Sequence, residues 1–325
     1  MATAALVTPT LEDVFRARKT IAPYLQPTPL RRYPALDRLV GTQVLVKHEN
    51  HLPTGAFKVR GGINLVSQLP DADRTRGLIT ASTGNHGQSI AYAASLFGVS
   101  ATVCAPDGAN PVKVDAIRDY GADVILAGRT FDEAKANAER IAAERGLRYV
   151  HSGDEPLLIA GVATHTLEIF EMEPSVDTVI VPLGGGSGAA GACIAAHTLK
   201  PDADVIAVQS TQSPSAHRSW SARQLIDAPN QTIAEGLATG QPFALPQRIL
   251  WDLLREFVLV SDDELLAATL TMLTVTRNLV EPAGAAALAA ALQLRERLHG
   301  RTVALICSGG NISPAQLRDA LARAG

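Results

Sequence analysis

The sequence is poor in several kinds of residue, and each scarcity argues against a class of protein. It has only three cysteines, Cys104, Cys193 and Cys307, and they form no CxxC pair and no Cys/His metal spacing. A disulfide framework and a zinc site are therefore disfavoured. The 29 basic residues are balanced by 32 acidic ones, with no basic run, which argues against a nucleic-acid partner. No uninterrupted apolar stretch approaches the roughly 18 residues that span a bilayer, so we expect no membrane contact.

The start of the chain lacks a basic segment followed by a sustained apolar stretch, so it does not resemble a secretory signal. Together with the unpaired cysteines, this predicts a cytoplasmic protein. Aromatic residues make up only 4% of the chain although 46% of it is hydrophobic, so its core must depend on small side chains and close helix–strand contact. The length of 325 residues exceeds the roughly 250–300 at which single cores stop growing, which predicts two lobes.

From Leu78 onward, short apolar runs alternate with longer amphipathic ones. This alternation predicts βαβ units around a parallel sheet, and hence an α/β fold. The predicted strands cover residues 78–82, 101–105, 124–127, 178–182, 205–208 and 303–307, and the predicted helices residues 85–97, 111–120, 131–144, 157–170, 188–199, 262–276 and 282–299. In such folds the binding site lies where strands end and helices begin, so the loops at these places are the candidate site.

One of these loops is rich in glycine. Residues 184–188 read Gly-Gly-Gly-Ser-Gly between a predicted strand and a predicted helix, and backbone amides in that position can bind a phosphate group. The segment from Gly186 to Gly191 also matches the dinucleotide fingerprint GxGxxG. The next strand ends in Gln209, however, where that fingerprint needs an acidic residue. A nicotinamide dehydrogenase is therefore disfavoured, and a ligand with a single phosphate is the better candidate.

Five further segments accompany the glycine loop. They are Glu49-Asn-x-x-Pro-Thr-Gly-Ala-Phe-Lys58, Ser82-Thr-Gly-Asn-His-Gly87, Thr232-Ile-Ala-Glu-Gly-Leu237, Glu281-Pro-Ala-Gly-Ala285 and Ser308-Gly-Gly-Asn311. Each is a weak signal alone, and a lone lysine such as Lys58 is usually a solvated surface charge. All six together, in this order over nearly the whole chain, resemble the serine/threonine dehydratase and serine racemase family of fold-type II pyridoxal-phosphate enzymes.

The resemblance implies a fold and a domain organisation. The expected architecture is two-lobed, based on parallel sheets, and similar to that of the tryptophan synthase β subunit. Residues 1–76 and 151–325 would form the large lobe, which binds pyridoxal 5'-phosphate, and residues 77–150 would form the small lobe. Members of the family are commonly dimers, so the resemblance also implies a homodimer.

The resemblance further implies roles around the cofactor. Lys58 would form the Schiff base with pyridoxal phosphate and later act as the base on the substrate α-proton. The implied cofactor-binding residues are Lys58 itself, Phe57 and Asn85 at the ring, Glu281 at the wall of the site, Ser308 at the pyridine nitrogen, and Gly184, Gly185, Gly186, Ser187 and Gly188 at the phosphate. The neutral hydroxyl of Ser308 favours a protonated pyridine less than a carboxylate would. The ring is then a weaker electron sink, which favours elimination of a β-substituent over a long-lived carbanion.

The loop at residues 82–87 is implied to bind the substrate carboxylate. Ser82, Thr83, Asn85 and His86 lie there, where a helix N-terminus offers free amides. A histidine at a helix start is more often structural, so both interpretations of His86 stay open. Thr83 occupies the position at which serine racemases have a serine that acts as a second acid/base. Its hydroxyl makes Thr83 a second candidate catalytic residue beside Lys58 and keeps racemisation open.

Two segments depart from the family pattern. Ala56 stands where the family usually has serine, which should affect local hydrogen bonding more than the identity of the enzyme. Residues 209–215 contain no carboxylate, although racemase-like members bind Mg²⁺ through a glutamate and an aspartate in this stretch. Hard cations need such oxygen ligands, so we expect no metal at this place.

These observations predict a pyridoxal-phosphate-dependent dehydratase, an ammonia-lyase that eliminates water from a 3-hydroxy-L-amino acid and releases a 2-oxo acid and ammonia. Threonine and serine are the default substrates, and a bulkier one such as phenylserine is compatible with the departures. The alternatives are a serine racemase, a β-replacement synthase of the cysteine synthase type, and a ligand-binding protein without activity. The synthase branch usually carries Thr-Ser-Gly-Asn-Thr-Gly at residues 82–87, and the retained Lys58 argues against the binding protein.

Overall fold

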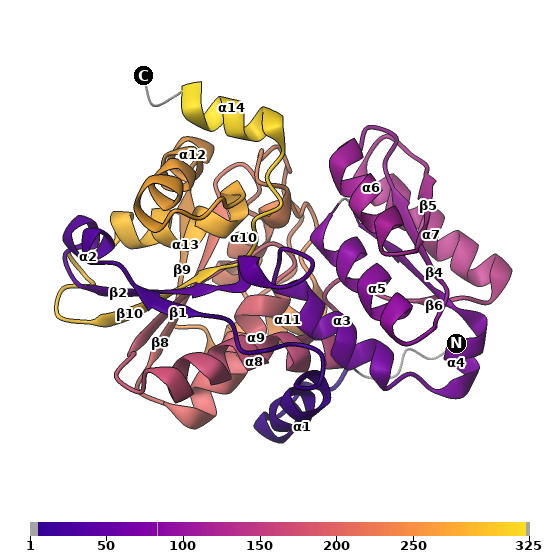
Figure 1. The fold of residues 1–325 in the computed structure, drawn as a ribbon, viewed down its shortest axis with the longest axis horizontal. Coiled ribbons are helices and arrows are strands. Elements are labelled where there is room, and N and C mark those ends of the chain that lie inside the picture. The colour runs from indigo at the N-terminus through magenta and orange to yellow at the C-terminus, as the bar shows by residue number, and fades with distance from the viewer. Residues whose placement is uncertain (1–5, 83, 323–325) are drawn as a thin grey trace.

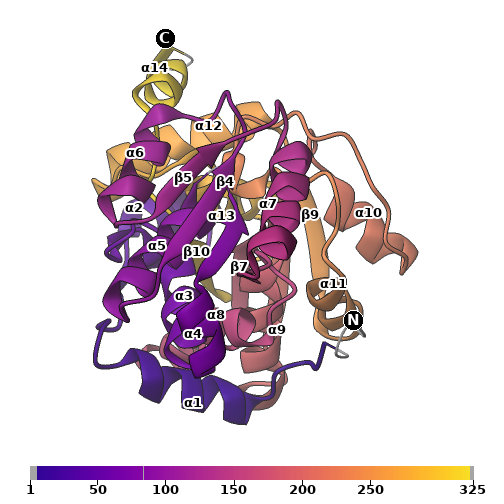
Figure 2. The same cartoon turned by 90° about the vertical axis from the view of Figure 1, so that its right-hand side faces the viewer.

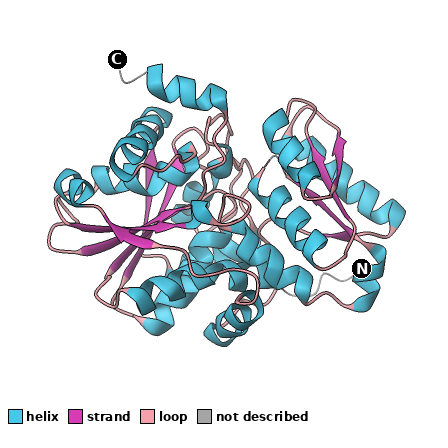
Figure 3. Cartoon of the chain, viewed as in Figure 1, coloured by secondary structure: helices cyan, strands magenta, loops and turns pink. Residues whose placement is uncertain are grey.

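The computed structural model describes residues 6–82 and 84–322, and its strands form two separate sheets (Figures 1 and 3). The larger sheet has the order β1-β2-β10-β7-β8-β9, in which every neighbouring pair except β1 and β2 is parallel. The smaller sheet has the order β5-β4-β3-β6 and is parallel throughout. The strands are β1 (Leu30–Arg32), β2 (Gln43–His48), β3 (Leu78–Ala81), β4 (Ala101–Ala105), β5 (Asp123–Leu126), β6 (Arg148–Tyr149), β7 (Thr178–Pro182), β8 (Asp204–Ser210), β9 (Glu256–Val260) and β10 (Thr302–Cys307). The predicted α/β fold is confirmed.

Helices cover both faces of the larger sheet. Val179 and Val181 of β7 pack towards one helical layer and Ile180 towards the other, as alternate strand positions require. The first layer contains α1 (Leu11–Ile21), α8 (Pro156–Met172), α9 (Ser187–Leu199) and α11 (Ala244–Leu253), and the second contains α2 (Pro34–Val40), α12 (Asp262–Thr271) and α13 (Pro282–Gln293). Because both faces are covered, the strand reads as a continuous apolar run.

The alanine-rich composition has a structural meaning in α13. Residues 282–291 are all buried, so this helix is surrounded by protein on every side. Short alanine side chains allow the helix to approach the sheet and its neighbour α12 closely. The core therefore depends on small side chains, as the scarcity of aromatic residues predicts.

The smaller sheet is also covered on both faces. Figure 2 shows α5 (Asn85–Leu96) and α6 (Pro111–Asp119) on one face and α7 (Phe131–Arg145) on the other. The helix α3 (Lys58–Ser67) lies between the two sheets, close to α4 (Asp71–Arg76) (Figure 1). One hydrophobic cluster joins Ile63 of α3 to Ile90 of α5 and to Leu158 of α8. The helix that begins at Lys58 therefore belongs to a core that joins the smaller sheet to helices α1 and α8, which cover the larger sheet.

Two predicted helices differ from the structure at their C-terminal ends. The helix predicted over residues 262–276 becomes a π-helical turn at Met272–Thr276, and α13 ends at Gln293 rather than near His299. Thr274 and Thr276 donate hydrogen bonds back to the carbonyls of Leu270 and Met272, and such back-bonding bends helices. Short elements complete the chain: 3-10 helices at Glu49–His51 and Glu235–Leu237, α10 (Ser215–Ala222) and α14 (Pro314–Ala322). Within residues 6–82 and 84–322, no helix has the length and apolar character needed to cross a membrane.

Candidate active site

A cavity of about 440 Å³ opens where strands of both sheets end. β3 of the smaller sheet leads into Ser82, while β7 and β10 of the larger sheet lead into the glycine loop and Ser308. Parallel strands bring their carboxyl ends to one edge, which explains why these loops meet. The predicted site residues that line the cavity are Phe57, Lys58, Ser82, Asn85, His86, Gly185, Glu281 and Ser308. Gly184, Gly186, Ser187 and Gly188 belong to the same glycine loop behind the wall, and Thr83 lies outside the described residues.

Lys58 is the first residue of α3 and projects its amine towards the glycine loop. Its Nζ donates a hydrogen bond to Ser187 Oγ at 3.2 Å and lies 5.3 Å from the centre of the Phe57 ring. In the part of the chain that the structure describes, no carboxylate pairs with this amine. Burial lowers the pKa of Lys58 to about 8. An amine of this kind is partly unprotonated near neutral pH and can act as a nucleophile or a base.

The glycine loop connects β7 to α9 and leaves its backbone amides available. None of the amides of residues 184–188 finds a hydrogen-bond acceptor among the described residues. Gly186 has a φ of 90°, which favours glycine, and a Cβ on Gly185 would lie 2.2 Å from the Phe243 ring. Free amides at the N-terminus of a helix suit a phosphate group, so the loop fits the phosphate of pyridoxal phosphate.

Asn85 is held from both sides of its amide. Its Nδ2 donates to Glu281 Oε1 at 2.5 Å, and its Oδ1 accepts a hydrogen bond from Asn311 Nδ2 at 2.8 Å. Asn311 in turn donates to the carbonyl of Thr54 in the loop before Lys58. The second N–H of Asn85 Nδ2 remains available at the cavity, where a ring oxygen could accept it.

Ser308 directly follows β10 and is hydrogen-bonded to the segment before Lys58. Its carbonyl accepts a hydrogen bond from Phe57 N at 3.0 Å, and Ala56 forms an isolated β-bridge with Gly309. The Ser308 hydroxyl donates to the carbonyl of Ala283 at 3.3 Å. A neutral hydroxyl is thus fixed at the cavity wall, in a segment that pairs with the residues directly before Lys58.

The loop after β3 is organised by its own side chains. Ser82 Oγ accepts hydrogen bonds from the amides of Gly84 at 3.1 Å and Gly87 at 2.9 Å. His86 lines the cavity, but its Nε2 is hydrogen-bonded to Thr80 Oγ1 at 2.9 Å. Burial, together with the charge of Lys58, lowers the pKa of His86 to about 3. His86 is therefore neutral at physiological pH, which favours its structural interpretation.

Comparison with known proteins agrees with this geometry. The model of the pyridoxal-phosphate-dependent enzyme family matches residues 21–309. The chain belongs to this family. It is 42% identical over 275 residues, 84% of this chain and 68% of the relative, to a protein of Geobacter sulfurreducens named L-threonine ammonia-lyase. It is 35% identical over 311 residues, 94% of this chain and 96% of the relative, to beta-hydroxyaspartate dehydratase of Paracoccus denitrificans.

Among solved structures, the chain is similar to the serine racemase of maize, with a TM-score of 0.92 and 29% identity over 98% of each chain. The predicted fold-type II architecture and the predicted cofactor are confirmed by these findings. The prediction of a pyridoxal-phosphate-dependent lyase of the dehydratase type is confirmed at the level of reaction class by the relatives.

The cavity of this pyridoxal-phosphate enzyme contains charged residues that the sequence did not reveal. Lys113 of α6 donates to Glu235 Oε2 at 2.8 Å and lies 3.5 Å from Glu281 Oε2. Burial alone would lower the pKa of Lys113, but the two carboxylates outweigh it and raise that pKa. Glu235 belongs to the segment Thr232–Leu237 that carried the family resemblance, whereas Lys113 had no signal beyond its place in a predicted helix. The other lining residues that were not predicted include Asn110, Phe131, Ser152, Asn230, Thr239 and Phe243.

The stretch at residues 209–215 meets a carboxylate from elsewhere in the chain. Ser210 Oγ and Thr232 Oγ1 both donate to Asp262 Oδ1, at 2.8 and 2.6 Å, and Ile233 N donates to Asp262 Oδ2 at 2.9 Å. The Asp262 carboxylate, which could otherwise bind a cation, is thus occupied by protein donors. Over residues 6–82 and 84–322, no three His, Cys, Asp or Glu side chains are grouped as a metal site requires.

Proposed function

We propose that the protein is an ammonia-lyase that dehydrates an uncharged 3-hydroxy-L-amino acid of the threonine or serine type to a 2-oxo acid and ammonia. The observation that carries the proposal is the Lys58 amine, which faces a phosphate-binding loop inside a cavity and pairs with no described carboxylate. The names of the Geobacter sulfurreducens and Paracoccus denitrificans relatives support the same chemistry.

The residues fit pyridoxal phosphate in a consistent way. The amides of residues 184–188 would hold the phosphate, while Asn85, Phe57 and Ser308 would contact the ring. When bound, the cofactor supplies an electron-withdrawing ring that acidifies the α-hydrogen of an attached amino acid. The Lys58 amine, whose pKa is about 8, would take that proton. The fixed, neutral Ser308 hydroxyl would withhold a negative charge from the ring, which favours loss of the β-hydroxyl.

The substrate carboxylate would bind at the N-terminus of α5. The amides of Asn85 and His86 have no hydrogen-bond acceptor among the described residues, and they lie in the first turn of that helix. Ser82 would contribute mainly by shaping the loop, since its oxygen accepts from two backbone amides there. His86 would support the loop from Thr80.

The electrostatics of the cavity favour an uncharged substrate side chain. The ammonium of Lys113 is already matched by Glu235 and Glu281, so a second substrate carboxylate would meet two anions, and apart from Lys58 the described lining residues offer it no unpaired cation. Phe131 and Phe243 supply apolar surface at the same cavity. We therefore propose threonine, serine or a larger neutral analogue such as phenylserine, and not 3-hydroxyaspartate, as the substrate class.

Racemisation of serine is the second candidate, because the maize serine racemase shares the fold over nearly the whole chain. It needs a second acid/base group on the face of the substrate opposite Lys58, and Thr83 is the candidate. The two activities give different products, so they are separable by experiment: dehydration gives a 2-oxo acid, whereas racemisation gives the D-amino acid.

The test begins with the visible absorption band of the cofactor–lysine linkage in purified protein incubated with pyridoxal phosphate. Lys58→Ala should abolish the band and lower 2-oxo acid release on the order of 10³-fold or more. Lys19→Ala, an exposed lysine of α1, is the control and should change neither. A panel of L-threonine, L-serine, 3-phenylserine and 3-hydroxyaspartate with chiral product analysis then assigns the substrate. The proposal fails if the wild-type protein shows no band, or if only the D-amino acid forms.

Three further features are proposed alongside the activity. The division into a large lobe of residues 1–76 and 151–325 and a small lobe of residues 77–150 is supported by the four-stranded sheet, whose strands lie between Leu78 and Tyr149. A homodimer is supported by the family resemblance and is tested by light scattering on the purified protein. A cytoplasmic location is supported by the three buried, unpaired cysteines.

A further inference from the structure

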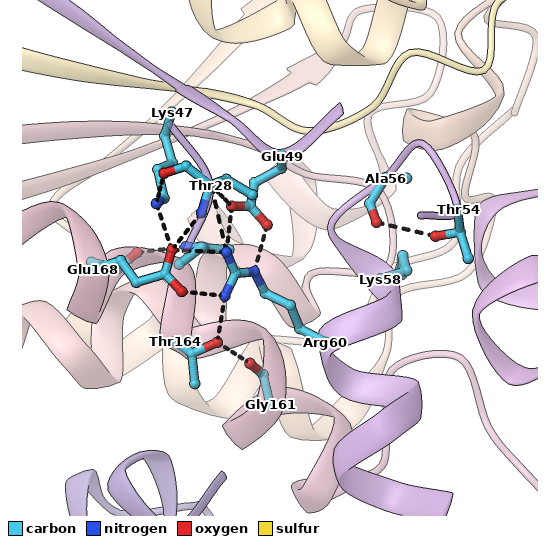
Figure 4. Close-up of polar contacts among 12 residues, drawn as sticks. Thr28, Lys47, Glu49, Thr54, Ala56, Lys58, Arg60, Gly161, Thr164 and Glu168 are labelled. Carbon is cyan, nitrogen blue, oxygen red and sulfur yellow. Dashed lines mark hydrogen bonds and ion pairs between the residues drawn. The ribbon is translucent and has the colours of Figure 1, made fainter. Parts of the chain in front are cut away.

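A cluster of charged side chains lies buried beside the helix that carries Lys58 (Figure 4). This buried ionic cluster consists of Lys47, Glu49, Arg60 and Glu168, whose exposed fractions are 0%, 0%, 1% and 6%. Two cations face two anions, so the cluster is neutral as a whole. Desolvating such charges is costly, and apolar residues of similar volume are often at least as stable. A gain in stability therefore does not explain the cluster, and the reaction proposed above uses none of its members.

Arg60 is the centre of the buried ionic cluster. Its Nε and Nη2 donate to the two oxygens of Glu49 at 2.6 and 2.9 Å. Its Nη1 and Nη2 donate to the two oxygens of Glu168 at 2.6 and 2.9 Å, and Nη1 also donates to Thr164 Oγ1 at 3.1 Å. All five N–H groups of the guanidinium thus have acceptors, which fixes both its position and its orientation.

The partners of Arg60 come from elements that frame the start of α3. Lys47 and Glu49 lie at the end of β2 and in the turn after it, and Glu168 lies on α8. Lys47 Nζ donates to Glu168 and to the carbonyl of Thr28, which ties the strand to the helix. α3 begins at Lys58 itself, and the residue before it, Phe57, provides no side-chain cap. The first turn of α3 is therefore anchored through Arg60 rather than through a cap.

Glycines determine how closely α3 approaches its neighbours. A Cβ on Gly61 would lie 2.9 Å from the carbonyl of Leu158 on α8, and one on Gly62 would lie 2.4 Å from Ser89 Oγ on α5. The Ser89 hydroxyl also donates to the carbonyl of Lys58 at 2.7 Å. Close contacts at glycines fix the distance between α3 and its neighbouring helices. They constrain the rotation of α3 about its own axis less than directional hydrogen bonds do.

The rotation of α3 links Arg60 to Lys58. Residues two positions apart in an α-helix, such as Lys58 and Arg60, are separated by about 200° around the helix axis. Their side chains therefore leave α3 on nearly opposite sides. In Figure 4 the Arg60 side chain points into the buried ionic cluster, away from Lys58. A rotation that satisfies the five donors of Arg60 is therefore the rotation that directs Lys58 towards Ser187 and the glycine loop.

We propose that the buried ionic cluster sets the rotation of α3 and thereby aims the Lys58 amine at the cofactor site, with Arg60 as the positioning residue. This inference rests on the role proposed for Lys58. In this role the directional ion pairs of the cluster specify one orientation of α3, whereas apolar packing alone would allow several.

The test compares variants that alter the cluster without touching the cavity. Glu168→Gln keeps the shape of the side chain but removes one anion, and Thr164→Val removes only one hydrogen bond of Arg60. The control is Asp204→Asn, which weakens a carboxylate–arginine contact with Arg301 at the start of β8 in the larger sheet. Thermal unfolding followed by circular dichroism establishes which variants fold.

Two readouts report on Lys58. The first is the rate at which the visible band forms after mixing with pyridoxal phosphate. We expect Glu168→Gln to slow it at least about tenfold and Thr164→Val about threefold, because misplacing a reacting group by about 1 Å can cost on the order of 100-fold. Asp204→Asn should stay within about twofold. The second is pH-dependent acetylation of Lys58 in the cofactor-free protein, followed by mass spectrometry. Glu168→Gln leaves a net positive charge in the cluster and should move the labelling midpoint to lower pH.

The proposal is overturned if the folded cluster variants combine with pyridoxal phosphate at the wild-type rate and label Lys58 with the wild-type midpoint. If Glu168→Gln does not fold, Thr164→Val decides by the rate of band formation, because this variant changes no charge. The two hypotheses are separable: a band that persists in Lys58→Ala refutes the proposed function, whereas a wild-type rate of band formation together with an unmoved labelling midpoint in Glu168→Gln refutes the positioning role.

Discussion

Two lysines line the same cavity in opposite electrostatic settings. Lys58 is hydrogen-bonded to Ser187, and burial lowers its pKa to about 8. Lys113 is more deeply buried, yet Glu235 and Glu281 offset its desolvation and raise its pKa. The two side chains are chemically identical, so the difference comes from the neighbouring carboxylates alone. Without a neighbouring carboxylate, a buried lysine has a lowered pKa; with two of them, Lys113 remains a cation and joins α6 to the 3-10 helix at Glu235 and to the start of α13 at Glu281.

The opposite pKa shifts of Lys58 and Lys113 also suit the two lysines to different roles. An amine with a pKa near neutrality can exchange protons with a substrate during a reaction. A cation held between two carboxylates instead keeps the charge of the cavity constant and fixes Glu281, which in turn holds Asn85. Variants that remove one charge at a time test whether the neighbouring carboxylates cause the difference between the two lysines.

The largest effect on stability should come from the paired lysine. Lys113→Met leaves the buried Glu281 carboxylate without its cation, so we expect the free energy of unfolding to fall by about 3–5 kcal/mol. Urea unfolding measures this change. Lys135→Met is the control, because Lys135 forms only a 3.8 Å pair with Glu139 at the surface and should cost less than about 1 kcal/mol. Equal losses in the two variants would contradict the role given to the carboxylates.

The reactive lysine should respond in the opposite direction. Lys58→Met removes a poorly solvated amine, so the cofactor-free variant should be more stable than wild type by about 1–3 kcal/mol at pH 7. The folded-state pKa of about 8 lies below the ordinary 10.5 of the unfolded chain, so the wild-type protein gains stability as pH rises between these values. The advantage of Lys58→Met should therefore shrink from pH 8 to pH 10.5 in denaturant titrations. A variant that is less stable than wild type at pH 7 would show that Lys58 is not strained by burial.

The smallest effect should come from His86, which carries no charge at either end of the physiological range. Its pKa of about 3 predicts that His86→Asn leaves the pH profile of activity between pH 5 and 8 unchanged. Loss of the hydrogen bond to Thr80 should cost about 1 kcal/mol of stability. Thr80→Val removes the same bond from the other side, together with the bond that Thr80 Oγ1 donates to the Val150 carbonyl, so it should cost more than His86→Asn and serves as the comparison. A tenfold or larger fall in kcat with wild-type stability would instead place His86 at the substrate.

The sequence predicted the parts of the site that depend on local patterns. The glycine loop, Ser308 and Lys58 each lie in a short motif at a strand end or a helix start, and strand order then brings them together. Lys113 and Arg60 were not recognised, because a charged residue in a helix is usually solvated. Their burial depends on carboxylates far along the chain: Glu235 lies 122 residues from Lys113, and Glu168 lies 108 residues from Arg60. No local pattern records such pairings.

The same limit applies to the fold. The alternation of strands and helices is clear from Leu78 onward, whereas the short β1 and the antiparallel pairing of β1 with β2 have no comparable periodic signal. The predicted helix over residues 262–276 also differs from the structure, because threonine side chains bond back to the backbone near its end, and α13 ends at Gln293, before the predicted end near His299. Thr83, on which the choice between dehydration and racemisation partly depends, lies outside the described residues.

The packing of α13 determines where the substrate range of this enzyme can be redesigned. A Cβ on Gly284 would lie 2.1 Å from the carbonyl of Gly309, and the alanines around it are already buried, so substitutions behind Ser308 would displace the backbone. Phe131 and Phe243, by contrast, are half-buried side chains at the cavity wall that smaller residues could replace. Engineering for larger amino acids should therefore target these two aromatic residues and leave the alanine scaffold intact.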